Sequence, residues 1–341
     1  MYHLRHIQHR ISFSYVSIRG FHPSPSRLEN LMMIVEANST RIYKQNKRWK
    51  YKMEKQFFND VTISTVTYRV KNLNKMKRYY NEVIGLEILK DEETEGIVEL
   101  GFKGQDAPQL ILDGKADYKL ITGPKNGLFH TAWLLPSRAA LGDVLYRMLL
   151  NQTQLSGASD HSYSEALYLQ DPEDNGIEIY ADRTADQWTH DPNGGVTGVT
   201  EPMDAEGVLA SRSSDEPQAF FAEGTIIGHL HLSSAKVEDF FGFLTDEMVL
   251  EEQMGFTNNV HFTSYSDYHH HIAVNAWGAE AMVPYAEDQT GLAAYTLTYH
   301  NQELYNNIVA KLKANGRVVA EEANHVTAKD ANGVIVYVDF K

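Results

Sequence analysis

Hydrophobic and polar positions from about residue 60 onward follow a pattern that occurs four times along the chain. In the first copy, an alternating run from Val66 to Val70 predicts a strand, and the helical run after it stops at Gly85. Three more strands are predicted behind this helix, at residues 86 to 89, 97 to 102 and 109 to 112. The order is βαβββ, and similar units begin at Gly127, Ile227 and Gly291.

The spacing of the four units predicts how the chain is divided. Aligning the first strands places four residues at one equivalent position, with separations of 65, 99 and 66: Thr65, His130, His229 and Tyr295. The extra length in the middle falls in a polar segment rich in Asp, Gly, Ser and Pro, which is typical of a linker. We therefore predict an α+β fold of four βαβββ modules in two domains, residues 60 to 183 and 224 to 341, joined by a linker at residues 184 to 223.

A single module of this kind presents half a sheet with an unfilled concave face, so modules must pair to close a cavity. Two pairings are open: module one with two and three with four, or module two with three. The linker of about 40 residues spans either arrangement at up to ~3.3 Å per residue. Function is expected in the cavity.

The hairpin at the end of the second module contains the first chemical signal. Its last strand alternates Ile177, Glu178 and Ile179, so that both isoleucines pack under a covering helix and the carboxylate points to the concave face. A carboxylate in the middle of a sheet is costly to desolvate unless a cation or hydrogen-bond donors meet it. Glu178 is therefore a candidate metal ligand.

The same hairpin carries a family likeness. His161, Leu167-Tyr168, Asp171-Pro172 and Glu178 resemble the signature of the extradiol ring-cleaving dioxygenases of the vicinal oxygen chelate (glyoxalase) superfamily, of the two-domain, catechol 2,3-dioxygenase-like kind. The sequence departs from the pattern at Asp174, where the family usually has Gly, and this should alter only the turn. The resemblance implies that Glu178 binds iron, that Tyr168 hydrogen-bonds the substrate and that His161 is an acid/base outside the metal ligands.

In this superfamily a paired site has four metal positions, and the resemblance assigns them to His130, Glu178, His229 and His271. If module two pairs with three, then His130, His229 and Glu178 converge as two imidazoles and one carboxylate, a set that leaves coordination positions open. If the two halves pair separately, a histidine-only site forms in the second half from His229, His271 and one further side chain, with Tyr295 nearby.

The expected activity is metal-dependent extradiol cleavage of a catechol-like aromatic by O2, with Fe2+ as cofactor and Mn2+, Zn2+ or Ni2+ as alternatives. This would place the chain in the catabolism of aromatic compounds. Two other classes remain open. One is a glyoxalase-type isomerase or lyase that uses all four metal positions, and the other is a non-catalytic binder similar to bleomycin-resistance proteins, whose cavity would be lined by Trp133, Tyr168 and Trp277.

Composition and charge narrow the class of protein. The chain has no cysteine, which excludes disulfides and thiolate metal sites. Ten Lys/Arg and only two acids fall in residues 1 to 52, and the rest carries a net charge of −22, so nucleic acid is not an expected partner. No apolar run is long enough to span a membrane, and we expect a cytoplasmic protein whose homo-oligomerisation is left open.

The basic segment of residues 1 to 52 has three interpretations: a transit peptide, a nucleic-acid-binding arm, or sequence upstream of the true start. We favour the last, because Met53 opens directly onto the first patterned strand, and we expect the segment to be poorly ordered.

Overall fold

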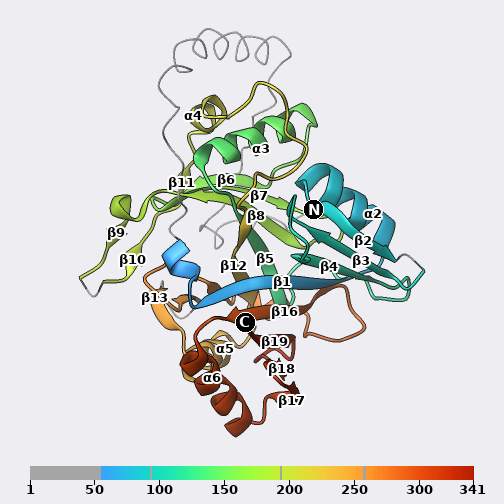
Figure 1. Cartoon of the computed structure of the whole chain (residues 1–341), viewed down its shortest axis with the longest axis vertical. Helices are drawn as coiled ribbons and strands as arrows, with labels where there is room; N and C mark the ends of the chain where they lie inside the picture. Colours follow the sequence, from blue (N-terminus) through green and yellow to red (C-terminus); the bar gives the residue numbers. More distant parts are fainter. Residues whose placement is uncertain (1–54, 93, 193, 256–258) are drawn as a thin grey trace, which may run out of the picture.

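The computed structural model describes residues 55 to 341, apart from residues 93, 193 and 256 to 258, and is shown in Figure 1. The predicted basic extension, residues 1 to 52, lies outside the described residues. Among the described residues, no helix is long and apolar enough to cross a membrane.

The four βαβββ modules predicted from the hydrophobic pattern are confirmed. The first comprises β1 (Val61–Val70), α2 (Leu73–Arg78) continued by the π-helical turn η2 (Tyr79–Ile84), β2 (Glu87–Glu92), β3 (Ile97–Gly101) and β4 (Leu110–Gly114). The second comprises β5 (Gly127–Leu134), α3 (Arg138–Leu150), β6 (Gly157–Asp160), β7 (Ser164–Gln170) and β8 (Gly176–Asp182).

The second half of the chain repeats this order. The third module comprises β12 (Ile226–Ser233), α5 (Val237–Gly242) continued by η4 (Phe243–Glu247), β13 (Glu251–Gly255), β14 (Val260–Ser264) and β15 (Ile272–Asn275). The fourth comprises β16 (Gly291–Tyr299), α6 (Gln302–Ala314), β17 (Val318–Glu322), β18 (His325–Lys329) and β19 (Ile335–Phe340). Short helical turns precede the first module and the fourth, namely η1 (Lys55–Phe58) and η5 (Ala279–Ala281).

Helix boundaries follow the side chains at their ends. The Ser137 hydroxyl accepts a hydrogen bond from the backbone N–H of Ala140 and caps α3, while the Asn301 side chain accepts from Glu303 and Leu304 and caps α6. At the C-terminal end of η2, Gly85 has a φ of 95°, a conformation that ends a helix and suits glycine.

Within each module the first and last strands are parallel neighbours: β1 with β4, β5 with β8, β12 with β15, and β16 with β19. Between modules, β5 pairs antiparallel with β12, and β1 pairs antiparallel with β16. Module two therefore pairs with three and module one with four. Of the pairings that the sequence left open, the one that crosses the linker is observed. The boundaries of the two predicted domains remain a prediction. Each predicted domain contributes one module to each of the two module pairs.

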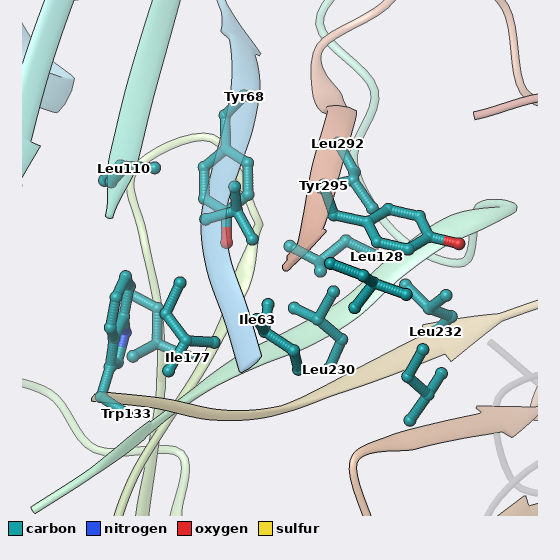
Figure 2. Packing of buried hydrophobic residues seen from close by; sticks show 14 of the residues in the cluster. Ile63, Tyr68, Leu110, Leu128, Trp133, Ile177, Leu230, Leu232, Leu292 and Tyr295 are labelled. Carbon is teal, nitrogen blue, oxygen red and sulfur yellow. The ribbon is translucent and has the colours of Figure 1, made fainter. Parts of the chain in front are cut away.

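The two module pairs meet back to back. Ile63 of β1 pairs with Ile227 of β12, and the first strands of all four modules contribute apolar side chains to one core. Figure 2 shows this packing, with labelled side chains from β1, β5, β12 and β16 facing one another: Ile63, Tyr68, Leu128, Trp133, Leu230, Leu232, Leu292 and Tyr295.

The predicted linker folds against module two. It contains η3 (Ala185–Gln187), the small hairpin β9 (Thr189–His190) and β10 (Val196–Thr197), then β11 (Glu201–Pro202) and α4 (Ala205–Ala210). Strand β11 extends the sheet by pairing with β6, and α4 lies on α3 at the upper end of Figure 1. The contact depends on Gly142, because a Cβ atom there would lie 2.4 Å from the Val208 carbonyl oxygen.

One buried arginine ties module one, module two and the linker together. Arg147 on α3 is 4% exposed, and its guanidinium donates to the carbonyl oxygens of Ile84 at 2.5 Å and Gln218 at 2.7 Å. Burial lowers the pKa of Arg147 to about 10, although the carboxylate of Asp143 acts in the opposite direction, so the side chain stays charged at neutral pH.

We expect Arg147→Met to lower the free energy of unfolding by about 2 to 4 kcal/mol, because the buried carbonyl of Ile84 and the carbonyl of Gln218 lose a charged donor. The measurement is urea denaturation, with Arg78→Met as control. Arg78 is exposed, and among the described residues its Nε donates to Asn74 O within its own helical segment, so its replacement should change the stability by less than about 0.5 kcal/mol. Equal effects of the two substitutions would contradict the bridging role of Arg147.

Candidate metal centre

Each first strand carries a β-bulge next to the position at which the modules were aligned. In the pairing of β5 with β12 the register shifts at Phe129 and Gly228, and in the pairing of β1 with β16 it shifts at Ser64 and Ala293. Bulges redirect the side chains that follow them and are common beside active sites. The residues that follow are Thr65, His130, His229 and Ala294, with separations of 65, 99 and 65.

The predicted equivalence of Thr65, His130 and His229 therefore holds. The fourth equivalent residue is Ala294, one position before the predicted Tyr295. Tyr295 instead lies in the hydrophobic core (Figure 2), where it is 1% exposed. Its hydroxyl donates to Asp330.

The register of the last strands corrects a second prediction. On β8, Glu178 lies opposite Ala132, and the equivalent residue opposite His231 on β15 is Ala273. The sequence alignment matched His271 to Glu178, which is two residues out of register. His271 precedes β15 and both of its ring nitrogens have protein partners: Nδ1 bonds the Ser264 hydroxyl at 2.8 Å and Nε2 bonds the Phe57 carbonyl at 3.1 Å.

Three of the four predicted metal ligands do meet. The Oε2 atom of Glu178 lies 3.0 Å from Nε2 of His130 and 3.1 Å from Nε2 of His229. One potential ligand atom from each residue falls within 4.8 Å of the other two, and all three side chains are buried. In the part of the chain that the structure describes, this is the one group of three or more His, Cys, Asp or Glu residues with such geometry.

These distances suit a bound cation. Nitrogen and oxygen donors lie about 2.0 to 2.2 Å from a divalent metal such as zinc, so donors at neighbouring corners of an octahedron are about 3.0 Å apart. The Nε2 atom of His130 is buried and makes no well-directed hydrogen bond within the described residues. A buried imidazole nitrogen without such a bond has a lone pair with which it can coordinate a metal ion. The residues therefore fit a metal ion held by two imidazoles and a carboxylate.

The electrostatics of the group agree with this assignment. Burial by itself would raise the pKa of Glu178, but the imidazoles of His229 and His130 outweigh it and hold that pKa well below its usual value. For His229, burial lowers the pKa to about 4, against the opposing effect of Glu178. At neutral pH the group thus presents an ionised carboxylate and a neutral His229, the forms that bind metals.

Tyr168 and His161 lie next to this group. Tyr168 faces Glu178 across the β7–β8 pair, and its ring is 5.9 Å from that of His130. Its hydroxyl lies 2.6 Å from Nε2 of His161, and Nδ1 of His161 lies 2.8 Å from the Val199 carbonyl oxygen. Because a carbonyl can only accept, Nδ1 of His161 carries the proton, and Nε2 accepts from Tyr168.

Two further histidines lie at the site, and neither of them was among the predicted metal ligands. The ring of His270 is 4.1 Å from that of His229, and the ring of His231 is 4.9 Å from that of His130. Both are buried, and burial holds both pKa values well below the usual range. His231 was visible as the residue that shares a strand face with His229, whereas nothing in the sequence distinguished His270 from its neighbours.

Partly exposed aromatic rings surround these histidines. Phe129 and Trp277 are 5.2 Å apart and both contact His231, while Phe262 contacts His231 and His270. Trp133, which was expected to line the cavity, instead lies in the hydrophobic core (Figure 2). Its ring packs against that of Phe102.

The other module pair has the same strands without the donors. At the four positions that correspond to the metal group it carries residues that are poor metal ligands as a set: Thr65, Ile111, Ala294 and Tyr337. The candidate centre therefore belongs to modules two and three alone.

Buried neutral histidines make stability depend on pH. Burial lowers the pKa of His271 to about 3, and an unfolded histidine titrates near 6.5. Between these values the unfolded chain binds more protons, so this contribution to stability is present above pH 6.5 and is lost as the pH falls toward 3.

We therefore expect the unfolding free energy of the metal-free protein to fall between pH 7 and pH 5, as measured by urea denaturation. His271→Gln should show a shallower fall, by about one proton taken up per molecule on unfolding. Identical slopes for the two proteins would contradict the assignment of a neutral, buried His271.

Comparison with known proteins identifies the family. A model of the Glyoxalase/Bleomycin resistance protein/Dioxygenase superfamily matches residues 62 to 179. A catechol-2,3-dioxygenase of Bacillus subtilis (strain 168) is 32% identical over 272 residues, which cover 80% of this chain and 94% of that relative.

Solved structures agree on the fold. A candidate dioxygenase from Bacillus subtilis subsp. subtilis str. 168 superimposes with a TM-score of 0.54 at 12% identity, covering 83% of this chain and 86% of that chain. A glyoxalase I mutant from Zea mays gives a TM-score of 0.50 at 13% identity, covering 82% of this chain and 94% of that chain. The chain has the four-module fold and matches a relative over most of its length. It therefore belongs to the glyoxalase/bleomycin resistance protein/dioxygenase superfamily.

Proposed function

We propose that this protein is an extradiol ring-cleaving dioxygenase that acts on a catechol-like aromatic with O2 and uses Fe2+ held by His130, Glu178 and His229. The observation that carries the proposal is the set of donors. Two imidazoles and one carboxylate meet at one point, and Ala273 stands where a fourth protein ligand would be. Three protein ligands leave coordination positions open for a substrate and for oxygen. The similarity to a catechol-2,3-dioxygenase supports the same reaction class.

The ion, when bound, would supply the positive charge that acidifies a catechol hydroxyl and the redox chemistry that ring cleavage by oxygen requires. The remaining tasks fall to side chains. The aromatic rings of Phe129, Phe262 and Trp277 offer faces and edges against which a substrate ring can pack.

Tyr168 would hold a substrate hydroxyl through its oxygen. Its own proton points to Nε2 of His161, and a phenolic oxygen that donates one hydrogen bond can also accept one, here from the substrate hydroxyl. The phenolic proton can then pass to His161, whose Nδ1–H is fixed by the Val199 carbonyl. His161 would thus act on the substrate through Tyr168, as an acid/base one hydrogen bond away.

His270 is a second group for proton transfer. It packs on the ring of the metal-ligating His229, and burial keeps it neutral, with a lone pair able to accept a proton. We assign it the role of a proton acceptor and donor that comes from module three, whereas Tyr168 comes from module two.

A glyoxalase-type isomerase would use a fourth ligand, His271. That residue bonds Ser264 and Phe57 instead, and the described residues do not assemble the four-ligand set. A purely sequestering protein would have no need for the buried triad. The cytoplasmic location and the homo-oligomer considered from the sequence stay predictions.

Metal stoichiometry tests the ligand assignment. Glu178→Ala should weaken binding of iron(II) by on the order of 100-fold or more, since losing a partner outside the ligands already costs about 10- to 100-fold. His271→Gln is the matched control and should bind one ion per chain with the affinity of the original protein. Isothermal titration with metal, followed by elemental analysis, measures both. Loss of the ion from His271→Gln with retention in Glu178→Ala would reverse the assignment.

Oxygen uptake tests the reaction. The iron-loaded protein should consume one O2 per catechol-type substrate in an oxygen electrode and yield a ring-opened product with a new visible absorbance, while the zinc-loaded protein should be inactive. A panel of unsubstituted, alkylated and carboxylated catechols serves as substrates. Absence of uptake with the whole panel, or activity of the zinc form on a glyoxalase substrate without oxygen, would overturn the proposal.

A further inference from the structure

A second carboxylate and imidazole lie behind His270, outside the metal group. Asp182 is the last residue of β8 in module two, and its Oδ1 lies 3.1 Å from Nε2 of His269 in module three. Nδ1 of His269 in turn lies 2.9 Å from Nδ1 of His270. The three residues form a chain of hydrogen bonds that runs from the end of β8 to the ring that packs on His229.

When both imidazole rings are neutral, the acceptor character of the Asp182 carboxylate decides which ring nitrogens of His269 and His270 carry hydrogens. An ionised carboxylate only accepts, so Nε2 of His269 carries a hydrogen and, in the neutral ring, Nδ1 of His269 is a lone pair. The Nδ1 of His270 must then be the donor in the contact between the two rings. Neutral His270 therefore has its lone pair on Nε2.

The surroundings leave His269 no other orientation. Its ring is fully buried between the ring of Tyr163 at 4.3 Å, with which it is stacked, and that of Tyr268 at 3.9 Å. A flip of the ring would replace nitrogen by carbon at both ends of the chain, and two buried hydrogen bonds would be lost. The order of donors and acceptors is thus built into the packing.

We propose that Asp182 and His269 are positioning residues for the reaction, which hold His270 in the tautomer with a hydrogen on Nδ1 and a lone pair on Nε2. The inference rests on the proposed function, because it gives His270 its task there. It also explains why two adjacent buried histidines meet nitrogen to nitrogen and end on a carboxylate of the other module.

The substitution Asp182→Asn tests the direction of the hydrogen bonds that join Asp182, His269 and His270. The Tyr268 hydroxyl lies 2.9 Å from the other oxygen of Asp182, so the asparagine oxygen should face Tyr268 and its NH2 group should face His269. His269 then accepts at Nε2, donates from Nδ1, and forces His270 to carry its hydrogen on Nε2. A base held in the wrong tautomer loses its function, as is known for catalytic triads.

The direct measurement is nitrogen-15 NMR of the metal-free protein labelled at histidine, which distinguishes protonated from unprotonated ring nitrogens. We expect a protonated Nδ1 and an unprotonated Nε2 on His270 in the original protein, and the reverse in Asp182→Asn. The control is Tyr268→Phe, which removes the other hydrogen bond to the same carboxylate and should leave His270 protonated on Nδ1. A protonated Nε2 on His270 in the original protein would overturn the proposal.

Kinetics separate positioning from mere stability. With the iron-loaded protein, Asp182→Asn should lower kcat by about 100-fold, a typical value for loss of general acid/base catalysis, with KM and metal content within about threefold of the original. Tyr268→Phe should stay within about threefold in kcat. In a His270→Gln background, Asp182→Asn should lower kcat no further, whereas an equal further loss would show that Asp182 acts only on the fold.

The two hypotheses fail in different ways. If no catechol supports oxygen uptake, the proposed function is wrong, and the NMR experiment still decides the tautomer of His270. If uptake is normal but the tautomer does not change in Asp182→Asn, the proposed role of Asp182 is wrong and the dioxygenase assignment stands.

Discussion

The antiparallel contact between β5 and β12 is the interaction on which the candidate site depends. It brings His130 and His229 to the same place, and β8, the parallel neighbour of β5, adds Glu178. Burying a carboxylate costs several kcal/mol unless opposite charge or donors compensate it. Here the two imidazoles, and a cation when bound, provide that compensation, so the strand pairing and the ionisable group are mutually dependent. A module on its own supplies at most two of the three donors.

Much of this arrangement was visible in the sequence, because strands alternate with period two. Alternation placed Glu178 on the concave face, and the internal repeat made His130 and His229 equivalent. The pairing of modules was not visible, since any half-barrel can offer a partner edge and the linker is long enough for either arrangement. The role of the predicted linker was also hidden: its short α4 and β11 pack on module two through contacts, such as that of Gly142 with Val208, that leave no periodic signal.

Errors in the predicted site have one physical origin, which is strand register. A bulge adds a residue to one strand, so counting along the sequence loses the phase at Ala293 and selects Tyr295 instead of Ala294. The loop before β15 has no alternation to follow, and His271 was matched to Glu178 although Ala273 occupies that place. The network behind His270 depends on contacts between modules and was therefore beyond a pattern argument. The module pair that lacks donors shows that the fold persists without the chemistry.

The pairing of β1 with β16 has a consequence for how the chain assembles. Val66 and Tyr295 are neighbours in the sheet although they lie near opposite ends of the described sequence. During synthesis from the N-terminus, β1 therefore leaves the ribosome long before its partner exists, and one of its edges stays open to wrong pairing for that time. Modules two and three, in contrast, have all their strands once Asn275 has been made. Such long-range closure slows folding, so the half that holds the histidines and Glu178 can form first, and module four completes the other half last.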